Sequence, residues 1–365
     1  MIEATPQTAA TSVFDQMSTM EHKQLVFCND ESTGLKAIIA LHNTVLGPGM
    51  GGTRMWNYAT EEEAIKDALR LSRGMTFKNA IAGLNIGGGK AVIIGDARKI
   101  KNEALMRRFG RFVHSLGSRY WTAEDVNMST RDMEYIRMET PYVAGLPVSM
   151  GGSGDPSPVT AYGVYMGMKA SAKKVYGSDS LAGKRVVVQG AGHVGSYLIG
   201  YLNEEGAEVM VSDIFEDKLA AVSRDYKVKV IDPDDVYSTE MDIYAPCALG
   251  ATLNDDTIEQ LKCTIVAGGA NNQLDDEDRH ARMLKDQGII YAPDFLINSG
   301  GITNVYYEMQ GNYNKDRVMA QTERIFDVCT EVIEYGEKND VTTHKAALDL
   351  ALKRIEQIGK VKLPY

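Results

Sequence analysis

Short apolar runs alternate with helical periods of hydrophobic residues along the first third of the chain. Three runs rich in valine, isoleucine and leucine are predicted as strands, at residues 25–28, 35–41 and 91–94. A helix is predicted over 60–73, because Thr60 and Glu63 have the spacing of a capping box and Gly74 can end the helix. With a second helix predicted over about 102–116, this part of the sequence indicates an α/β domain.

A segment rich in glycine and proline, residues 145–158, separates this part from the rest and is interpreted as a hinge or linker. A helix is predicted directly after it, over about 160–176. Six short strands follow, with helical patterns between several of them, at 185–189, 208–212, 228–231, 242–244, 264–266 and 288–291. This rhythm is typical of a doubly wound parallel sheet. Two more helices, over about 315–336 and 342–358, close the chain.

The charge and composition of the chain exclude several classes of partner. Forty-nine acidic against 39 basic residues give a net charge of −10, so no nucleic-acid partner is expected. The four cysteines stand singly and the six histidines form no HxxxH pair, so neither a metal site nor a disulfide framework is predicted. The N-terminus lacks a signal-peptide pattern, and no apolar run reaches the roughly 18 residues of a membrane span. We therefore expect a soluble cytoplasmic protein with no membrane partner.

The segment from Arg185 to Asp213 has the order of a dinucleotide-binding site: strand, glycine-rich turn, helix, strand and acid. The first glycine of such a turn permits a tight bend, the second lets the backbone approach a pyrophosphate, and the third lets helix and strand pack closely. We predict that the turn contacts the cofactor through Gly190, Gly192, His193, Val194 and Gly195. Asp213 can bind both ribose hydroxyls of the adenosine half.

The predicted cofactor is NAD rather than NADP. A carboxylate at Asp213 repels a 2′-phosphate, and neither Ile214 nor Phe215 offers a cation in its place. Whether Arg224 or Lys218 folds back toward the site stays open from the sequence. The predicted fold class is thus α/β with two domains, an N-terminal α/β substrate and assembly domain and a Rossmann-type doubly wound dinucleotide-binding domain. Their predicted bounds are 1–148 and 149–339, with a C-terminal helix, 340–365, packing on the first.

Two lysines stand in an otherwise uncharged stretch, residues 75–94, where Lys78 and Lys90 are the only ionisable side chains. In a closed apolar cleft, desolvation and mutual repulsion would move the pKa of one amine toward working pH, so that it can act as a base. The other, still cationic, could hold a substrate carboxylate. The alternative is a pair of surface lysines that flank a strand.

No acid stands in that stretch, but Asp125 ends an apolar aromatic run further along, where a strand would deliver it to a sheet edge. Glu124 is its immediate rival. Neighbouring residues on a strand point to opposite faces, so only one of the two enters a shared cleft, and the sequence does not choose between them.

Seven ordered blocks between about residues 20 and 335 resemble the Glu/Leu/Phe/Val dehydrogenase family, and within it the leucine dehydrogenase branch. They are GPGMGGTRMW (47–56), RGMTFKNAIAGLNIGGGK (73–90), TAEDV (122–126), PSPVTAYGV (156–164), YAPCALGATLN (244–254), AGGANNQL (267–274) and APDFLINSGGITNV (292–305). The resemblance implies NAD-dependent, reversible oxidative deamination of an L-amino acid to a 2-oxo acid and ammonium. It also implies a homo-oligomer, often an octamer.

The resemblance further implies roles for residues in these blocks. Lys90 would be the base that assists deprotonation and attack of water, and Asp125 would handle protons of the α-amino group. Lys78 would bind the α-carboxylate, with help from backbone N–H groups of Gly51 and Gly52 and the amide of Asn298. The nicotinamide half of the cofactor would contact Thr160 and Asn271.

The implied side-chain pocket is apolar. Family members that act on glutamate resemble this chain but carry a lysine where Met50 stands, and a buried methionine cannot pair the distal carboxylate. The other implied contacts are Met75, Ala123, Ile302 and Val305. Leucine, valine and isoleucine are the expected substrates. Phenylalanine is the alternative, because pocket volume discriminates by only about 1–3 kcal/mol per methylene.

Two other classes of function fit these residues less well than a dehydrogenase of amino acids does. A non-catalytic NAD-sensing protein would have lost its polar catalytic set, yet Lys78, Lys90 and Asp125 are all present. A 2-hydroxy-acid dehydrogenase usually needs a histidine with an acidic partner as proton acceptor. His193 lies in the cofactor turn and His114 lies on a predicted helix face, so neither is placed for that chemistry.

Overall fold

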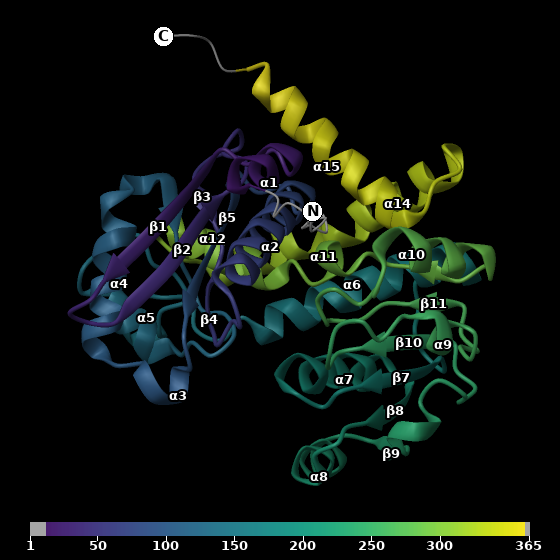
Figure 1. The fold of residues 1–365 in the computed structure, drawn as a ribbon. Coiled ribbons are helices and arrows are strands. Elements are labelled where there is room, and N and C mark those ends of the chain that lie inside the picture. Colours follow the sequence, from purple (N-terminus) through teal and green to yellow (C-terminus); the bar gives the residue numbers. More distant parts are fainter. Residues whose placement is uncertain (1–11, 362–365) are drawn as a thin grey trace, which may run out of the picture. The chain divides into compact units, whose positions relative to one another are not determined.

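The computed structural model describes residues 12–361, which form two compact units (Figure 1). The first unit extends to Thr76 and includes Asn85–Leu146; the second comprises Phe77–Leu84 and the chain from Pro147 onward. The division at Leu146 falls in the glycine- and proline-rich segment. Residues 1–11, where the signal-peptide pattern was sought, and 362–365 of the predicted last helix lie outside the described residues.

The first unit is built on a six-stranded sheet in the order β1-β2-β5-β3-β6, with β4 paired to β5. The pairs β1–β2 and β2–β5 are antiparallel, and β3 and β4 each run parallel to β5. The strands are β1 Gln24–Asp30, β2 Leu35–Leu41, β3 Gly49–Met50, β4 Thr53–Trp56, β5 Gly87–Ile94 and β6 Tyr120–Trp121. Strands at all three predicted positions are present, and the third begins earlier because its glycines are part of it.

Alternation along β2 explains why this strand is apolar throughout. Ile39 and Leu41 belong to one core cluster with Phe109, whereas Ile38 and Ala40 belong to a second cluster on the opposite side. A strand buried on both faces reads as a continuous hydrophobic run. The helices of this unit are α1 Val13–Thr19, α2 Glu61–Ile81, α3 Ala97–Ile100, α4 Glu103–Ser115 and α5 Thr130–Arg137, with a 3₁₀ turn at Gly117–Arg119.

Helix α2 corrects one prediction, because it does not end at Gly74 but continues to Ile81. A glycine inside a helix costs only about 1 kcal/mol relative to alanine. Thr76, Phe77 and Ala80 beyond it are buried, and their packing outweighs that cost. The division between the two units falls inside this helix, after Thr76.

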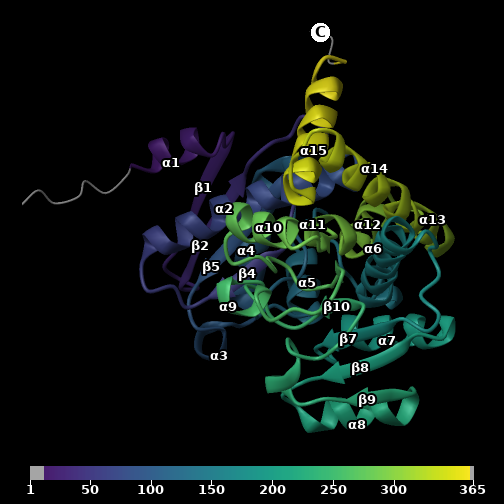
Figure 2. The ribbon, with the colours of Figure 1, turned by 90° about the vertical axis from the view of Figure 1, so that its right-hand side faces the viewer.

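The second unit contains a six-stranded, all-parallel sheet in the order β12-β11-β10-β7-β8-β9 (Figures 1 and 2). Its strands are β7 Arg185–Gln189, β8 Glu208–Ser212, β9 Val228–Val230, β10 Ile243–Pro246, β11 Ile265–Val266 and β12 Ile290–Tyr291. Read from β9, this is the 3-2-1-4-5-6 order of a doubly wound dinucleotide-binding sheet. The predicted α/β class with a Rossmann-type domain is confirmed.

The helices of this unit are α6 Ser157–Tyr176, α7 His193–Glu205, α8 Glu216–Asp225, α9 Asp255–Ile258, α10 Glu277–Asp286, α11 Asp294–Ile297, α12 Gly300–Met309, α13 Lys315–Glu323, α14 Ile325–Lys338 and α15 Thr343–Gly359. Two short 3₁₀ turns, Val148–Met150 and Pro233–Asp235, complete the unit. The single helix predicted over 315–336 is two helices, which meet at Arg324.

The C-terminal helix α15 differs from the prediction in its neighbours. It packs against α14, α10 and β12, and it is assigned to the second unit rather than to the first (Figure 1). The Arg354 guanidinium donates to the carbonyls of Leu84 at 2.8 Å and Ala80 at 3.3 Å. The segment Phe77–Leu84, which the sequence placed in the first domain, therefore belongs to the second unit with α15.

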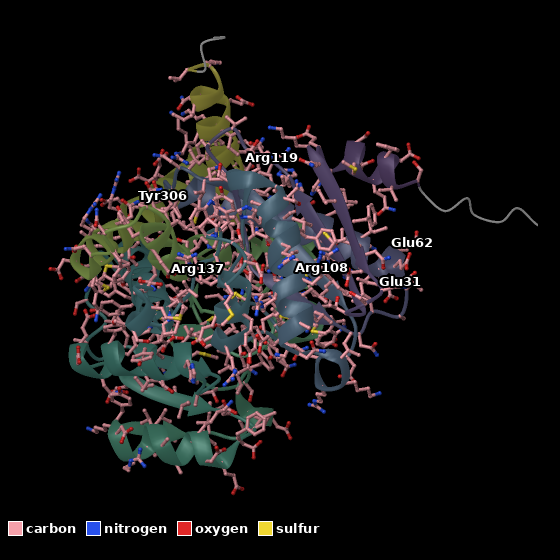
Figure 3. The ribbon with its side chains drawn as sticks, turned by 90° about the vertical axis from the view of Figure 1, so that its left-hand side faces the viewer. Glu31, Glu62, Arg108, Arg119, Arg137 and Tyr306 are labelled. Atoms are coloured by element: carbon pink, nitrogen blue, oxygen red, sulfur yellow. The ribbon has the colours of Figure 1, made fainter. Side chains whose placement is uncertain are left out.

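Over residues 12–361, no helix has both the length and the apolarity that crossing a membrane requires. Within the same residues no three His, Cys, Asp or Glu side chains are grouped so that they could hold a metal ion. On the first unit, Arg108 of α4, labelled in Figure 3, pairs with Asp30 at the end of β1 at 2.9 Å.

Candidate active site

A buried ion pair joins two of the predicted catalytic residues. Lys90 lies on β5 and is only 6% exposed, and its Nζ lies 2.8 Å from Oδ2 of Asp125. Asp125 follows β6 in a segment that runs beside β4, where the N–H of Thr53 donates to the carbonyl of Ala123 at 2.8 Å. The structure thus brings together a lysine and an acid that are distant in the sequence.

The choice between the two neighbouring acids follows from their environment. Glu124 is exposed and forms a bridge with Thr53 through its backbone, whereas the Asp125 side chain is 24% exposed and pairs with Lys90. A Cβ on Gly52 would lie 2.4 Å from the carbonyl oxygen of Glu124 and 3.0 Å from Cβ of Asp125. Glycine at 52 is therefore what allows this segment to lie so close to β4.

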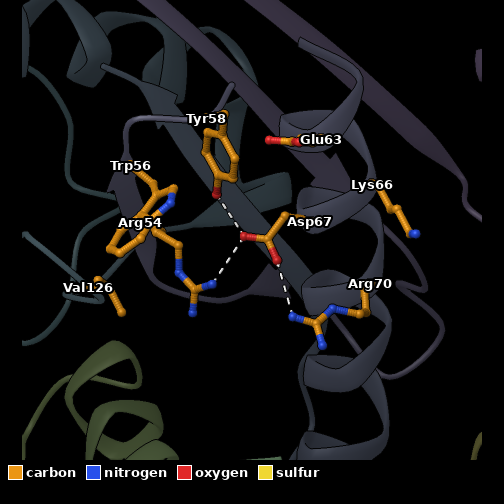
Figure 4. A pocket seen from close by; sticks show the side chains of 8 residues that line it. All are labelled: Arg54, Trp56, Tyr58, Glu63, Lys66, Asp67, Arg70 and Val126. Carbon is orange, nitrogen blue, oxygen red and sulfur yellow. Dashed lines mark hydrogen bonds and ion pairs between the residues drawn. The ribbon is translucent and has the colours of Figure 1, made fainter. Parts of the chain in front are cut away.

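Arg54 is a second cation on Asp125 that the sequence analysis did not single out. Its Nε donates to Asp125 Oδ2 at 3.0 Å, and its Nη1 donates to Asp67 Oδ2 at 3.0 Å. Tyr58 also donates to Asp67 Oδ2, at 2.7 Å (Figure 4). Arg54 stands in the GGTRMW block, but its carboxylate partners come from α2 and from the segment after β6. Nothing in the local sequence pairs them.

The electrostatics of the pair follow from burial and from this second cation. Burial lowers the pKa of Lys90 below its usual value and outweighs the opposing effect of Asp125. Burial alone would raise the pKa of Asp125, but Lys90 and Arg54 together hold that pKa below its ordinary range. The result is a carboxylate beside an amine that gives up its proton more readily than a lysine in water.

Glycines account for the tight packing around this pair. A Cβ on Gly88 would lie 2.0 Å from Thr76 Oγ1, so only glycine lets β5 lie against α2. A Cβ on Gly51 would lie 1.7 Å from the carbonyl oxygen of Gly89. The Gly51 N–H donates to the carbonyl of Trp121 at 3.3 Å, so the implied use of this N–H for a substrate carboxylate meets a competing partner.

The residues implied to line the side-chain pocket in this unit are apolar and enclosed. Met50 is 1% exposed and Ala123 is 8% exposed, while Met75 is half-buried. In the second unit, Val305 is buried and Ile302 is half-buried, both on α12.

Three of the remaining predicted site residues meet in the second unit. Lys78 Nζ donates to Oδ1 of Asn271 at 3.3 Å, and Nδ2 of Asn298 donates to the same oxygen at 2.8 Å. Lys78 lies in the last turn of α2, within the segment that belongs to this unit. Asn298 is buried and ends α11. Thr160, on α6, donates through Oγ1 to the carbonyl of Pro156 at 3.0 Å.

The glycine-rich turn has the geometry of a phosphate-binding loop. Gly190 has φ +111°, where a side chain would be strained, and a Cβ on Gly195 would lie 2.0 Å from the Gly190 carbonyl oxygen. Gly192 caps α7 without a side-chain hydrogen bond, and a Cβ there would meet no atom of the described residues within 4 Å. Exposed His193 and half-buried Val194 begin the helix. Its first N–H groups are therefore suited to a pyrophosphate.

The acid after β8 is held toward this turn. Asp213 accepts hydrogen bonds from the N–H of Ala191 at 2.7 Å and the N–H of Phe215 at 2.9 Å. Lys218 lies over the Phe215 ring, with Nζ 4.4 Å from its centroid. Arg224 pairs with its neighbour Asp225 at 2.9 Å. Lys218 thus lies beside Phe215, and Arg224 pairs with its neighbour in the sequence. The glycine-rich turn and the acid after β8 fit a nicotinamide dinucleotide.

The chain matches two models of one protein family. Residues 22–142 match a family model described as Glu/Leu/Phe/Val dehydrogenase, dimerisation domain. Residues 151–215 and 211–362 match the model described as Glutamate/Leucine/Phenylalanine/Valine dehydrogenase.

Similar proteins cover nearly the full length. Leucine dehydrogenase from Thermoactinomyces intermedius is 53% identical over 97% of this chain and 96% of its own. That from Bacillus subtilis is 54% identical over the same shares of both chains. The crystal structure of L-tryptophan dehydrogenase from Nostoc punctiforme matches with a TM-score of 0.86 and 43% identity, covering 96% of this chain and 100% of that one. The fold, the two matched models and this identity agree, and the chain belongs to the Glu/Leu/Phe/Val dehydrogenase family of amino-acid dehydrogenases.

Proposed function

We propose that this protein catalyses the reversible NAD-dependent oxidative deamination of branched-chain L-amino acids, leucine foremost, to 2-oxo acids and ammonium. The observation that carries the proposal is the buried pair, with Lys90 Nζ 2.8 Å from Asp125 Oδ2. A desolvated amine beside a carboxylate is a pair of titratable groups whose environment suits proton transfer near neutral pH. The leucine dehydrogenases that are 53–54% identical to this chain support leucine as the substrate.

The roles of the pair follow from the order in which protons must move. An α-ammonium group must lose a proton before its lone pair can form the C=N bond of an iminium. Asp125, held as a carboxylate by Lys90 and Arg54, accepts that proton. Lys90, whose lowered pKa makes its neutral form accessible, takes a proton from the water that adds to Cα. Collapse of this adduct releases ammonia and forms the 2-oxo acid.

A bound nicotinamide would supply the acceptor for the hydride that leaves Cα. The residues of the second unit then have positioning roles. Lys78 and Asn298, which share Asn271 as a partner, bind the substrate carboxylate. Backbone N–H groups of Gly51 and Gly52 in the first unit are further proposed contacts of the substrate, and that of Gly51 would have to share its bond to Trp121. Holding the reacting atoms in line supplies much of the barrier reduction in such a reaction.

NAD is the proposed cofactor rather than NADP. The Asp213 carboxylate already accepts two backbone N–H groups beside the glycine-rich turn, and a 2′-phosphate there would meet like charge. Ile214 and Phe215, the next two residues, are exposed and uncharged. Thr160 and Asn271 are the proposed contacts of the nicotinamide half, and Gly190, Gly192, His193, Val194 and Gly195 those of the pyrophosphate.

An aliphatic side chain is the proposed fit for the pocket. Met50 is buried where a glutamate-specific enzyme would need a cation, and burying an unpaired carboxylate beside it would cost several kcal/mol. Met75, Ala123, Ile302 and Val305 complete the proposed apolar lining. Branched Ile302 and Val305 leave less room for an aromatic ring than smaller residues would.

Assembly and location are proposed on separate grounds. The dimerisation domain described for residues 22–142 supports a homo-oligomer, and we propose the octamer that the sequence resemblance implied. All four cysteines are free, which supports a reducing compartment such as the cytoplasm.

The test is a substrate and cofactor panel followed by NADH absorbance. We expect L-leucine, L-valine and L-isoleucine to have the highest kcat/KM with NAD, L-phenylalanine to be lower, and L-glutamate to be poorer still. NADP should replace NAD only with a large loss of kcat/KM. Preference for phenylalanine would move the protein to a phenylalanine-type dehydrogenase. Turnover of a 2-hydroxy acid, or none of any amino acid despite tight NADH binding, would contradict the proposal.

A further inference from the structure

We propose that Arg54, Asp67 and Tyr58 form a positioning chain that fixes the Asp125 carboxylate beside Lys90 and sets the charge balance of the pair. The inference rests on the proposed function and assigns it three further residues, none of which reacts with substrate. We name these residues the Arg54 chain.

At the centre of the Arg54 chain, the forked guanidinium of Arg54 lies between two carboxylates. Arg54 uses Nε for Asp125 and Nη1 for Asp67, each at 3.0 Å. Asp125 therefore has two cations, Lys90 at 2.8 Å and Arg54, on one oxygen, Oδ2. A planar guanidinium with donors in fixed directions can hold two acceptors at once, which an ammonium on a flexible stem does far less well. The fork therefore fixes the carboxylate of Asp125 in orientation as well as in charge.

Asp67 is itself anchored, so that the fork has a fixed base. Its Oδ2 accepts from Tyr58 at 2.7 Å and from Arg54, and its Oδ1 accepts from Arg70 at 3.3 Å (Figure 4). Asp67 lies on α2 and Arg54 on β4, so the chain ties a helix to the strand beside Asp125.

The contact between Arg54 and Asp67 is shielded from solvent, whereas the contact between Asp67 and Arg70 is not. The side chains of Arg54 and Asp67 are 22% and 15% exposed, whereas that of Arg70 is 60% exposed. Exposed ion pairs contribute little and are screened, so the contact of Arg70 is the weakest link. The residues of the Arg54 chain line a pocket of about 540 Å³, which Lys66 also lines.

The charges of the Arg54 chain shift the pKa values of Asp125 and Lys90 in definite directions. Arg54 acts to lower the pKa of both Asp125 and Lys90, while Asp67 acts to raise the pKa of Lys90. Removing the Arg54 charge should therefore move both pKa values upward. Removing the Asp67 charge should move that of Lys90 downward. Tyr58 donates a hydrogen bond to Asp67 and brings no charge of its own while protonated.

The first experiment compares Arg54→Gln with Arg54→Lys through the pH profile of kcat/KM for L-leucine. Arg54→Gln should lower kcat by about tenfold or more, since small misplacement of a reacting group can cost about 10²-fold. The acidic limb of its kcat/KM profile, which reports the deprotonation of Lys90, should move to higher pH because the charge of Arg54 no longer lowers the pKa of Lys90. Arg54→Lys keeps the charge, so its limb should stay near that of the wild type, while kcat stays low because the fork is lost.

The second experiment separates position from charge. Tyr58→Phe removes one hydroxyl that anchors Asp67, and it should lower kcat several-fold with no displacement of the limb. Asp67→Asn should displace the limb to lower pH, opposite to Arg54→Gln. Lys66→Gln, which removes a cation from the same pocket, is the matched control and should leave rate and profile unchanged. KM for NAD should not change in any of these variants.

Folding is checked by circular dichroism and NADH binding, and Tyr58→Phe is the mildest change should Arg54→Gln not fold. Folded variants with wild-type kcat and profiles, or the same shift in Arg54→Gln and Asp67→Asn, would exclude a positioning chain.

The proposed function and the inference fail separately. An NMR titration of the Asp125 carboxyl carbon, run without substrate in the wild type and in Arg54→Gln, measures the coupling in any case. A raised pKa in Arg54→Gln supports the inference even for a protein that oxidises no amino acid. An unchanged pKa refutes it even for an active leucine dehydrogenase.

Discussion

Substitution of Lys90 by methionine tests the centre of the proposed mechanism. The change keeps an unbranched stem of similar length and removes the amine that lies 2.8 Å from Asp125. A positioned base contributes about 10²–10⁴-fold to a rate. At about 1.36 kcal/mol per tenfold, its loss should cost about 3–5 kcal/mol of transition-state stabilisation. We therefore expect kcat for L-leucine to fall by that factor.

The effect on stability should be much smaller than the effect on rate. Removing one partner of a buried ion pair costs about 3–5 kcal/mol when the other charge is left unpaired. Here Asp125 keeps Arg54 at 3.0 Å, and the lowered pKa of Lys90 shows that burial of its charged form is itself unfavourable. We expect a loss of about 1 kcal/mol, or a few degrees in Tm.

The assay combines NADH absorbance, thermal unfolding and NADH titration on Lys90→Met. Lys99→Met, at a lysine on the same unit whose side chain is 78% exposed, is the control and should behave as the wild type. The acidic limb of kcat/KM that reports the base should also disappear from the Lys90→Met profile. A folded Lys90→Met that binds NADH and turns over within about threefold of the wild type would refute a base at this position.

Three other substitutions probe the cofactor, the pocket and acid stability. Asp213→Ala should raise KM for NAD about tenfold or more, because hydrogen bonds to a charged group are worth about 1.5–3 kcal/mol, and an unchanged KM would contradict the ribose contact. Met50→Lys should gain activity on L-glutamate relative to L-leucine, measured as the ratio of kcat/KM values; a fixed ratio would remove Met50 from the pocket. Burial lowers the pKa of His42 from 6.5 to about 4, so the unfolded chain binds the proton first and stability should fall as pH drops from about 6.5 to 4. At about 1.36 kcal/mol per unit this amounts to about 3 kcal/mol, which urea titrations of His42→Gln should show as a flatter pH dependence, with exposed His114→Gln as the control.

The doubly wound sheet was predictable because its signals are local. Most of its strands are short runs rich in apolar residues, and the turn after β7 carries its three glycines within six residues, at positions 190, 192 and 195. Gly190 and Gly195 are needed for reasons that act within a few residues, namely a positive φ and a close approach to the helix. Local signals of this kind survive in a sequence read without any tertiary information.

The ends and neighbours of helices were less predictable, because packing decides them. Gly74 is a sound stop signal by propensity, yet α2 passes through it, since the residues beyond it are buried. The neighbours of α15 depend on contacts made by residues such as Arg354, whose partners lie on the segment Phe77–Leu84. A sequence pattern shows that such a helix has an apolar face but not which surface covers it.

The candidate site also has a part that the sequence predicts and a part that only the fold determines, and the difference has a physical cause. That Lys90 lies in an uncharged stretch is written in the sequence, because an ionisable group among apolar residues is visible as a contrast. Burying the charge of Lys90 is costly unless a partner offsets the desolvation, so the sequence also predicts that a buried Lys90 has a charged or polar partner. Which acid supplies it is a property of the fold: Asp125 reaches Lys90 only because Gly52 lets its segment lie against β4. Arg54 follows by the same requirement, since a carboxylate with one desolvated amine for a partner is better balanced by a second cation. A charged residue in an apolar stretch therefore predicts a network of polar partners around it, but which residues form that network is determined by the tertiary structure.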